Sequence, residues 1–489
     1  MAAGQTTFHN ALPFVLLAWV TVSCGNEDQA SAGHESTTSP ALQASELLPH
    51  QQMARDFLRE LIEIDTTQRT GNTTIAAEAM AAHLKAEGFA AEDVTVLGPT
   101  ENRGNLVVRY RGRDVGRKPL LLLAHLDVVD ADRADWSFDP FKMTEQDGYW
   151  YGRGTVDDKG EAAIHIANLI RLRREGFQPD RDIIVALTAD EEAGTENGVV
   201  WLLENHRDLI DAEYALNEGG RGAIRDGAYI ANGVQASEKI YQSFTLAVRN
   251  PGGHSSMPVK DNAIYRLADA LIRIRAYEFP VALNEITNAY FERSAAIEEG
   301  ELAAAMRGVL QYPPDSAAVA YLSNIPFYNS ILRTTCVATM LDAGHAENAL
   351  PQNAQATVNC RILPGESPDD VEDTLITVVG DKQVTVAPVA EATPSSPSPL
   401  TPEILGAMER ITEEMWPGVP VLPIMSSLAT DGLFLRNAGI PVYGVNGIFY
   451  DIAENRMHGQ DERVLIKSYL EGQEFLYRLT ARLSRSDEY

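Results

Sequence analysis

An unbroken apolar run leads directly into two polar residues in LLLLAHLD, residues 120–127. A run this short and this apolar predicts a β-strand that is buried on both faces. Side chains at the C-terminal end of such a strand project into the crevice where open α/β sheets place their chemistry. His125 at this point, with the carboxylate of Asp127 two residues on, indicates a metal ligand and the group that fixes its tautomer. A His-x-Asp pair is common by itself, so the function depends on the rest of the chain.

Further acids follow other predicted strands and loops. Each of them, taken alone, is typical of a solvated loop end. Acids and His residues gathered at the ends of several apolar strands are harder to explain in that way, and oxygen and nitrogen donors without a thiolate suit divalent metals such as Zn²⁺. The set comprises Asp157 and Asp158 in the Gly-rich loop 152–160, Glu191 and Glu192 after the strand 183–189, Glu218 after the strand 214–217, and His458 in a downstream loop.

Six ordered motifs together resemble the dinuclear zinc family of glutamate carboxypeptidase, aminoacylase, acetylornithine deacetylase and succinyl-diaminopimelate desuccinylase. The stretches around Asp127 and Glu218 favour its carboxypeptidase S-like branch. The resemblance runs from about residue 50 to the C-terminus. Its motifs are HLD (125–127), GRGTVDDKG (152–160), TADEE (188–192), NEGG (217–220), GGHS (252–255) and MHG (457–459).

The resemblance implies two Zn²⁺ ions per chain, for which Co²⁺ or Mn²⁺ can substitute. Asp157 would bridge the ions, and a shared carboxylate offsets the repulsion between two cations about 3.5–4 Å apart. One ion would take His125, Asp157 and Glu218, and the other Asp157, Glu192 and His458. Family members often have a cis peptide bond after the bridging Asp, which here is the Asp157–Asp158 bond.

The resemblance also implies the roles of residues that do not bind metal. Asp127 would accept the proton of the other His125 nitrogen and orient the ring. Glu191 would act as the general base on the water between the two ions. The alternative for Glu191 is a second acid in an acidic turn, without a catalytic role. His254 would donate to the developing oxyanion, often in the active site of the other subunit. Asn348 and Arg361 match positions that hold the substrate's carboxylate or carbonyl, although an exposed Arg on a strand edge is the alternative for Arg361.

The order of predicted elements indicates an α/β protein with a mostly parallel sheet flanked by helices and an inserted ferredoxin-like α+β lid. The lid would span residues 237–388 and carry the dimer contact. Residues 46–236 and 389–489 would form the zinc-binding catalytic domain. Residues 277–330 interrupt the lid with mostly helical sequence, to which the pattern assigns no role.

The N-terminal segment predicts export. Residues 11–22 form an apolar stretch too short to span a bilayer, and it ends in VSCG, residues 22–25. Small residues before Cys24 resemble a bacterial lipoprotein processing site, so residues 1–24 are interpreted as the signal segment and Cys24 as the lipidated residue. The segment lacks Lys and Arg, and Thr21 stands where such sites usually have Leu. A mis-assigned start and an ordinary cleaved signal are the alternatives. Residues 25–45 are typical of a disordered tether.

Composition excludes one class of partner and leaves one covalent question open. The formal net charge of −29 argues against nucleic acid as a partner.

Cys336 and Cys360 lie in two strand-like runs, 332–341 and 354–363, that a hairpin would set opposite each other. The sequence allows either a disulfide or two buried free thiols.

These features predict an exported zinc amidohydrolase, periplasmic or held at the membrane only by its lipid. It would cleave the amide bond of a C-terminal residue in a small peptide or of an N-acyl amino acid. A dipeptidase or amino-acid deacylase of the same family is the alternative within the class. A non-catalytic binding protein on the same scaffold is the alternative outside it.

Overall fold

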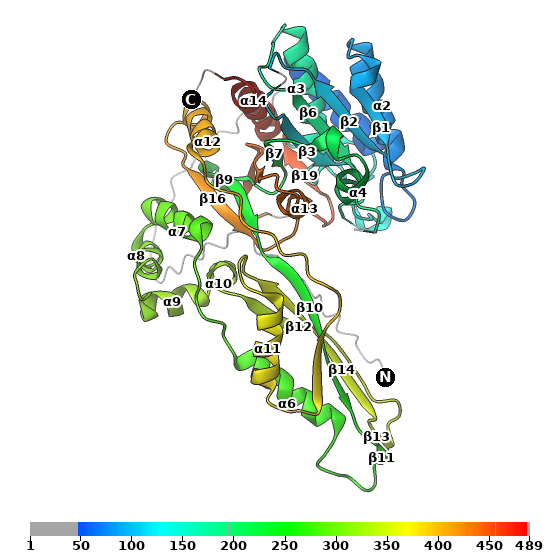
Figure 1. Cartoon of the computed structure of the whole chain (residues 1–489), viewed down its shortest axis with the longest axis vertical. Helices are drawn as coiled ribbons and strands as arrows, with labels where there is room; N and C mark the ends of the chain where they lie inside the picture. The colour runs from blue at the N-terminus through cyan, green and yellow to red at the C-terminus, as the bar shows by residue number, and fades with distance from the viewer. Residues whose placement is uncertain (1–46, 115, 193–194, 455, 487–489) are drawn as a thin grey trace, which may run out of the picture.

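The computed structural model describes residues 47–486, apart from 115, 193–194 and 455. Cys24 and the predicted tether lie outside the described residues. Figure 1 shows a large α/β domain, which includes the C-terminal helix, and an elongated second domain that extends away from it. Within the described ranges, no helix combines the length and apolar character needed to cross a membrane.

The predicted strand at residues 120–124 is β3 (Leu120–His125), inside a ten-stranded sheet. The strand order is β1-β2-β6-β3-β7-β17-β9-β8-β18, and β16 also pairs with β9. β3 runs parallel to β6 and β7, so the middle of the sheet is parallel as predicted. The other strands are β1 (Val94–Leu97), β2 (Asn105–Tyr110), β6 (Ile183–Thr188), β7 (Tyr214–Asn217), β8 (Gly222–Arg225), β9 (Ala228–Glu238), β16 (Val421–Ser426), β17 (Val442–Gly444) and β18 (Phe449–Asp451).

Both faces of β3 are buried, because helices cover the sheet on each side. Leu120 and Leu122 pack into one apolar core, and Leu121 and Leu123 pack into a second core on the opposite face. This alternation is what a period of two residues along a strand requires. The first core is covered by α1 (Pro49–Glu63), α2 (Thr73–Ala86), α3 (Lys159–Arg174), α12 (Pro402–Met415) and α14 (Ile466–Leu483), and the second by α4 (Gly198–Asn205), α5 (Arg207–Ile210) and α13 (Gly432–Asn437).

A small antiparallel sheet brings two distant loops together. It contains β4 (Thr144–Gln146), β5 (Tyr149–Tyr151) and β19 (Arg463–Leu465), with Tyr151 directly opposite Arg463. The Gly-rich loop that follows β5 therefore lies beside the loop that precedes β19, which carries His458.

The second domain is the predicted lid. Its four antiparallel strands have the order β12-β14-β10-β15, and two helices complete the β-α-β-β-α-β arrangement of a ferredoxin-like fold. At the end far from the large domain, β11 (Gly253–His254) pairs with β13 (Ala349–Leu350) (Figure 1). The elements are β10 (Ile240–Arg249), α6 (Ala263–Ala276), β12 (Thr335–Ala343), β14 (Asn353–Ile362), α11 (Pro368–Val379) and β15 (Val384–Pro388).

The structure resolves the question about the two cysteines in favour of a disulfide. Cys336 on β12 stands directly opposite Cys360 on β14, and the two sulfur atoms are bonded. The disulfide therefore ties the edge strand of the lid to its neighbour.

The helical interruption does not belong to the lid core, so the assignment of all of residues 237–388 to the lid needs correction. Its helices are α7 (Glu285–Ile297), α8 (Gly300–Val309), α9 (Ser316–Ser323) and α10 (Pro326–Leu332). Helix α7 packs against β16, and its buried Ile286, Tyr290 and Phe291 join the first core of the large domain. The physical reason is that the apolar side chains of α7 bury their surface in that core.

Candidate metal centre

The candidate metal ligands come from five segments that the fold brings to the carboxyl ends of the central strands. His125 is the last residue of β3, Glu191 and Glu192 follow β6, and Glu218 follows β7. Asp157 lies in the Gly-rich loop before α3. His458 reaches the same place from the loop before β19.

Asp157 lies between the two imidazoles. His125 Nε2 is 3.0 Å from Asp157 Oδ1, and His458 Nε2 is 3.0 Å from Asp157 Oδ2. His458 Nε2 is also 2.8 Å from Glu192 Oε1. Because each oxygen of Asp157 faces a different His, this carboxylate has the arrangement that a bridge between two metal ions needs.

The remaining acids complete the cluster around His125. One ligand atom each from His125, Asp157 and Glu192 lie within 4.8 Å of one another, and so do those of His125, Glu191 and Glu218. These groups differ in detail from the two ligand sets implied by the family, because Glu191 also approaches His125. All six side chains nevertheless belong to one connected cluster.

The electrostatics of the cluster are those of crowded, buried carboxylates. Burial and the nearby Asp157 raise the pKa of Glu218 to about 8. Burial and the nearby Glu218 raise the pKa of Glu191 well above its usual range. The hydrogen bond with Asp157 and that with Glu192 raise the pKa of His458 to about 10. Excess negative charge in a buried site of oxygen and nitrogen donors fits a divalent cation.

Asp127 supports the site in a different way from that predicted. His125 Nδ1 is 3.0 Å from the backbone carbonyl oxygen of Asp127, whereas the carboxylate Oδ1 lies at 3.6 Å. The carboxylate instead accepts the backbone N–H groups of Glu191 and Glu192, at 3.1 and 3.0 Å. Two backbone N–H donors, one for each carboxylate oxygen, therefore hold the side chain away from His125. Asp127 thus fixes the His125 ring with its main chain and the acidic turn with its side chain.

The structure reveals a buried acid, Glu462, that the sequence analysis missed. Its carboxylate accepts the backbone N–H groups of Gly154, Val156 and Asp157 at 3.1, 2.8 and 3.3 Å, and it pairs with Arg153 at 2.6 Å. Glu462 therefore holds the loop that carries Asp157. The one feature of the sequence that could have pointed to Glu462 is its position four residues after His458.

Asp431 is a second buried acid that the analysis missed. Its carboxylate accepts a hydrogen bond from Asn197 at 2.5 Å, and burial raises its pKa to about 7. Its negative charge also contributes to the raised pKa of Glu191. No local pattern around residue 431 marks it, since its partners are far away in the sequence.

The peptide bond between Asp157 and Asp158 is cis, as the resemblance implied. Asp158 is buried and accepts the backbone N–H of His125 at 3.3 Å.

The structure does not bring the predicted lid residues His254 and Asn348 to the metal ligands of their own chain. Both lie at the tip of the lid, where Asn348 O accepts the backbone N–H of Ser255 (Figure 1). His254 is exposed, and its Nδ1 accepts the backbone N–H of Ser256 at 3.1 Å. In the neutral ring the proton therefore sits on Nε2, which leaves Nε2–H as an outward donor.

Arg361 lies at the other end of the lid, close to the large domain. It occupies β14 opposite Tyr241, and its guanidinium lies 4.6 Å from the centre of the Tyr241 ring. Among the residues that the structure describes, no carboxylate forms an ion pair with Arg361. Its partly buried charge is therefore available to an anion from solution.

Comparison with known proteins supports the sequence resemblance. The model of Peptidase family M20/M25/M40 matches residues 121–482. The chain is 30% identical over 388 residues to "Probable carboxypeptidase S-like 2" of Dictyostelium discoideum, covering 77% of this chain and 73% of the relative. It is 29% identical over 393 residues to "N-fatty-acyl-amino acid synthase/hydrolase PM20D1" of Homo sapiens, covering 77% and 76%.

A solved structure shows the same fold. The M20 family metallo-carboxypeptidase Sso-CP2 from Sulfolobus solfataricus aligns with a TM-score of 0.65 at 16% identity, covering 88% of this chain and 99% of that chain. The fold, the donor cluster and these relatives together define a metallohydrolase. The chain belongs to Peptidase family M20/M25/M40.

Proposed function

We propose that this protein hydrolyses the amide bond of a C-terminal residue or of an N-acyl amino acid, with two Zn²⁺ ions and with Glu191 as general base. The observation that carries the proposal is the position of Asp157 between His125 and His458, with the partly buried Glu191 beside Glu218. The names of the relatives, a carboxypeptidase S-like protein and an N-fatty-acyl-amino acid synthase/hydrolase, support this substrate class.

The proposed assignment of the metal ligands is the one that the family resemblance implies, and the position of Asp157 between the two His residues supports it. His125, Asp157 and Glu218 would hold one ion, and Asp157, Glu192 and His458 the other. Two ions held by these residues would supply Lewis acidity and would lower the pKa of a bound water molecule.

Glu191 has the properties of a proton carrier. A carboxylate at this position would take a proton from water and pass it to the leaving amine. The backbone amide of Glu191 is fixed by Asp127, which limits where the carboxylate can move. The products are a carboxylate and a free amine.

Arg361 would hold the substrate's C-terminal carboxylate. A planar guanidinium without an ion-pair partner among the described residues suits this anion. His254 and Asn348 would act on the active site of a partner subunit, since both lie at the tip of the lid.

The lid edge supports a homodimer. β12 is an edge strand of the lid sheet, and Val337, Met340 and Leu341 on it are more than 60% exposed. A long exposed edge with apolar side chains is a template for strand pairing, and a second copy of the same edge is a self-complementary partner.

One experiment tests the proposed function. The protein is reconstituted with Zn²⁺, Co²⁺ or Mn²⁺, its metal content is measured, and it is given N-acyl amino acids, dipeptides and longer peptides with free or amidated C-termini. We expect two ions per chain, release of the C-terminal amino acid, and loss of activity both with chelator and on amidated peptides. Full activity without metal would exclude the two-metal assignment. Cleavage of dipeptides alone would favour the dipeptidase, and binding without turnover would favour the non-catalytic alternative.

We also propose that the protein is exported and anchored through Cys24. Cys24→Ser is expected to move the protein from the membrane fraction to the soluble fraction, because a doubly acylated Cys gives stable anchoring and the tether has no membrane affinity of its own. Fractionation of the full-length chain in a bacterial host measures this. An unchanged membrane fraction would exclude lipidation at Cys24.

A further inference from the structure

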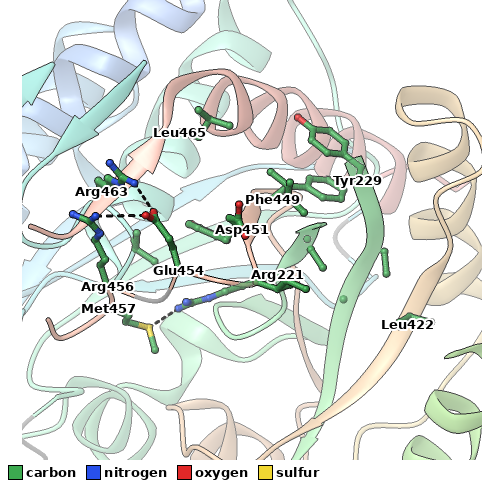
Figure 2. A pocket seen from close by; sticks show the side chains of 18 of the residues that line it. Arg221, Tyr229, Leu422, Phe449, Asp451, Glu454, Arg456, Met457, Arg463 and Leu465 are labelled. Atoms are coloured by element: carbon green, nitrogen blue, oxygen red, sulfur yellow. Dashed lines mark hydrogen bonds and ion pairs between the residues drawn. The ribbon is translucent and has the colours of Figure 1, made fainter. Parts of the chain in front are cut away.

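A cavity of about 440 Å³ lies at the end of the large sheet, beside the loops that carry Asp157, Glu218 and His458. Figure 2 shows it among β8, β9, β18 and the loop before β19. Its volume is within the range of about 300–1,000 Å³ that is typical of small-molecule sites. The side chains that the inference uses are Arg221, Ala223, Tyr229, Tyr290, Ile424 and Phe449.

The proposed metal ligands do not themselves line this cavity, but it adjoins the loops that carry three of them. Three of its lining residues are immediate neighbours of ligands: Val156 precedes Asp157, Gly219 follows Glu218, and Met457 precedes His458. A substrate whose scissile bond lies at the ligands therefore has room on this side within the large domain. In the proposed function the amino acid carboxylate is held by Arg361 of the lid.

Most of the cavity wall is apolar and firmly packed. Tyr229 and Phe449 stack with ring centres 4.3 Å apart. Ile424 comes from β16, and Tyr290 comes from the inserted helix α7. Helix α7 therefore helps to build this wall, which gives this part of the insertion a role.

The charged side chains of the wall are mostly neutralised by one another. Arg456 and Arg463 both pair with Glu454 (Figure 2). Arg221 donates to Met457 Sδ at 2.7 Å and lies 5.4 Å from the centre of the Tyr450 ring. The wall therefore offers apolar surface, with Arg221 as a donor near the metal ligands.

We propose that this cavity binds the acyl arm of the substrate, and that the arm is a long apolar chain. This inference rests on the proposed function and specifies it further, because a short acyl group such as acetyl would leave the apolar wall uncovered. Ala223, Ile424 and Tyr290 would set the length and width of the chain that fits.

A chain-length series gives the first test. N-acyl derivatives of one amino acid, from acetyl to hexadecanoyl, are compared below their aggregation concentrations. Each methylene buried in an apolar site is worth about fourfold, so kcat/KM should rise steeply with chain length until the cavity is full. A flat or falling series would overturn the proposal.

Matched variants locate the effect. Ala223→Phe puts a ring into the cavity and is expected to lower the ratio of long-chain to acetyl kcat/KM about tenfold or more. Ile424→Ala enlarges the cavity and should move the optimum to longer or bulkier chains. Ala228→Phe is the control, because Ala228 is exposed on the same strand as Tyr229 and does not line the cavity. Equal ratios in wild type and in both cavity variants, with unchanged melting temperatures, would overturn the proposal.

A binding measurement separates this inference from the proposed function. Calorimetry with decanoate should show tighter binding to the wild type than to Ala223→Phe, and acetate should show no such difference. If no N-acyl amino acid is hydrolysed but decanoate binding depends on Ala223, the proposed reaction fails and the chain-binding cavity stands. If N-acetyl substrates are hydrolysed and neither variant changes chain preference or decanoate binding, the cavity assignment fails and the reaction stands.

Discussion

Asp157 shows how one side chain organises the centre. Its two oxygens face two His residues that are 333 positions apart in the chain, His125 and His458. The backbone N–H of Asp157 is also held by Glu462. The position of Asp157 therefore depends on the Gly-rich loop and the C-terminal loop at the same time.

At the residue scale the sharpest prediction concerns Glu191. Glu191→Gln keeps the size of the side chain and removes its ability to take a proton, so we expect kcat to fall about 10²–10⁴-fold while the metal content stays unchanged. Steady-state kinetics and elemental analysis of the same preparation measure both quantities.

If Glu191→Gln kept a kcat within about tenfold of wild type, the general base would be a residue other than Glu191. Asp158 is then the next candidate for the base, although it is buried and accepts the backbone N–H of His125. Asp158→Asn in the Glu191→Gln background would show whether it carries the remaining activity.

At the scale of elements, the Gly-rich loop depends on Glu462. Glu462→Ala leaves the buried guanidinium of Arg153 without its carboxylate partner. It also leaves three backbone N–H groups of the loop without their acceptor. Breaking a buried ion pair typically costs roughly 3–5 kcal/mol, so we expect a large loss of stability and weaker metal binding through a displaced Asp157. Chemical unfolding and metal titration measure these effects.

Asp461→Ala is the matched control for Glu462. Asp461 is the adjacent acid and is only partly buried, and its carboxylate accepts hydrogen bonds from Ser137. If both variants lost the same stability and kept full metal affinity, Glu462 would have no special role in the loop.

The sequence was sufficient for the centre of the sheet and for the six clustered side chains. LLLLA at residues 120–124 marks a strand by composition alone, and each ligand follows a recognisable strand end or a motif of the family. Glu462 and Asp431 were missed because their partners lie far from them in the sequence. The placement of α7 was missed for a similar reason: an amphipathic helix shows that it packs on something, and not on which domain.

At the scale of the whole molecule, Lys239 lies where the chain passes from the large domain into the lid. Its buried Nζ donates to the carbonyl oxygens of Ser330 and Arg333 at 2.7 and 2.8 Å. Burial lowers the pKa of Lys239 to about 7 in the folded protein. The unfolded chain, with a Lys pKa of about 10.4, binds more protons between these values, so this group makes the protein more stable as pH rises from about 7 to about 10.

Comparison with Lys239→Met isolates that contribution. The free energy of unfolding of the wild type, minus that of Lys239→Met, should increase with pH over this window by at most about 1.4 kcal/mol per pH unit. Lys260→Met, at an exposed lid position, is the control and should show no such slope. A difference that stays constant or falls with pH would contradict the inferred burial of the charge.

The position of His254 at the lid tip predicts catalysis across two subunits. Inactive His254→Ala is mixed with inactive Glu191→Gln under conditions that allow subunits to exchange. If His254 acts on the partner, a mixed dimer contains one site that lacks both groups and one intact site, so activity should return. Loss of one oxyanion donor alone should cost about 10²–10³-fold in kcat.

Native mass spectrometry shows whether mixed dimers have formed. If mixed dimers form and activity does not return, His254 acts in the active site of its own chain or has no part in catalysis. A protein that remains monomeric at assay concentration, and is fully active, would exclude the lid-edge dimer as well.

The inserted helices change how this protein can be recombined with its relatives. The lid sheet is encoded in two separate stretches, because α7–α10 pack into the core of the large domain between β10 and β12. A transplant of residues 237–388 as one block would carry part of a foreign domain core with it. A lid exchange that preserves both cores must therefore transfer two segments and leave residues 285–332 in place.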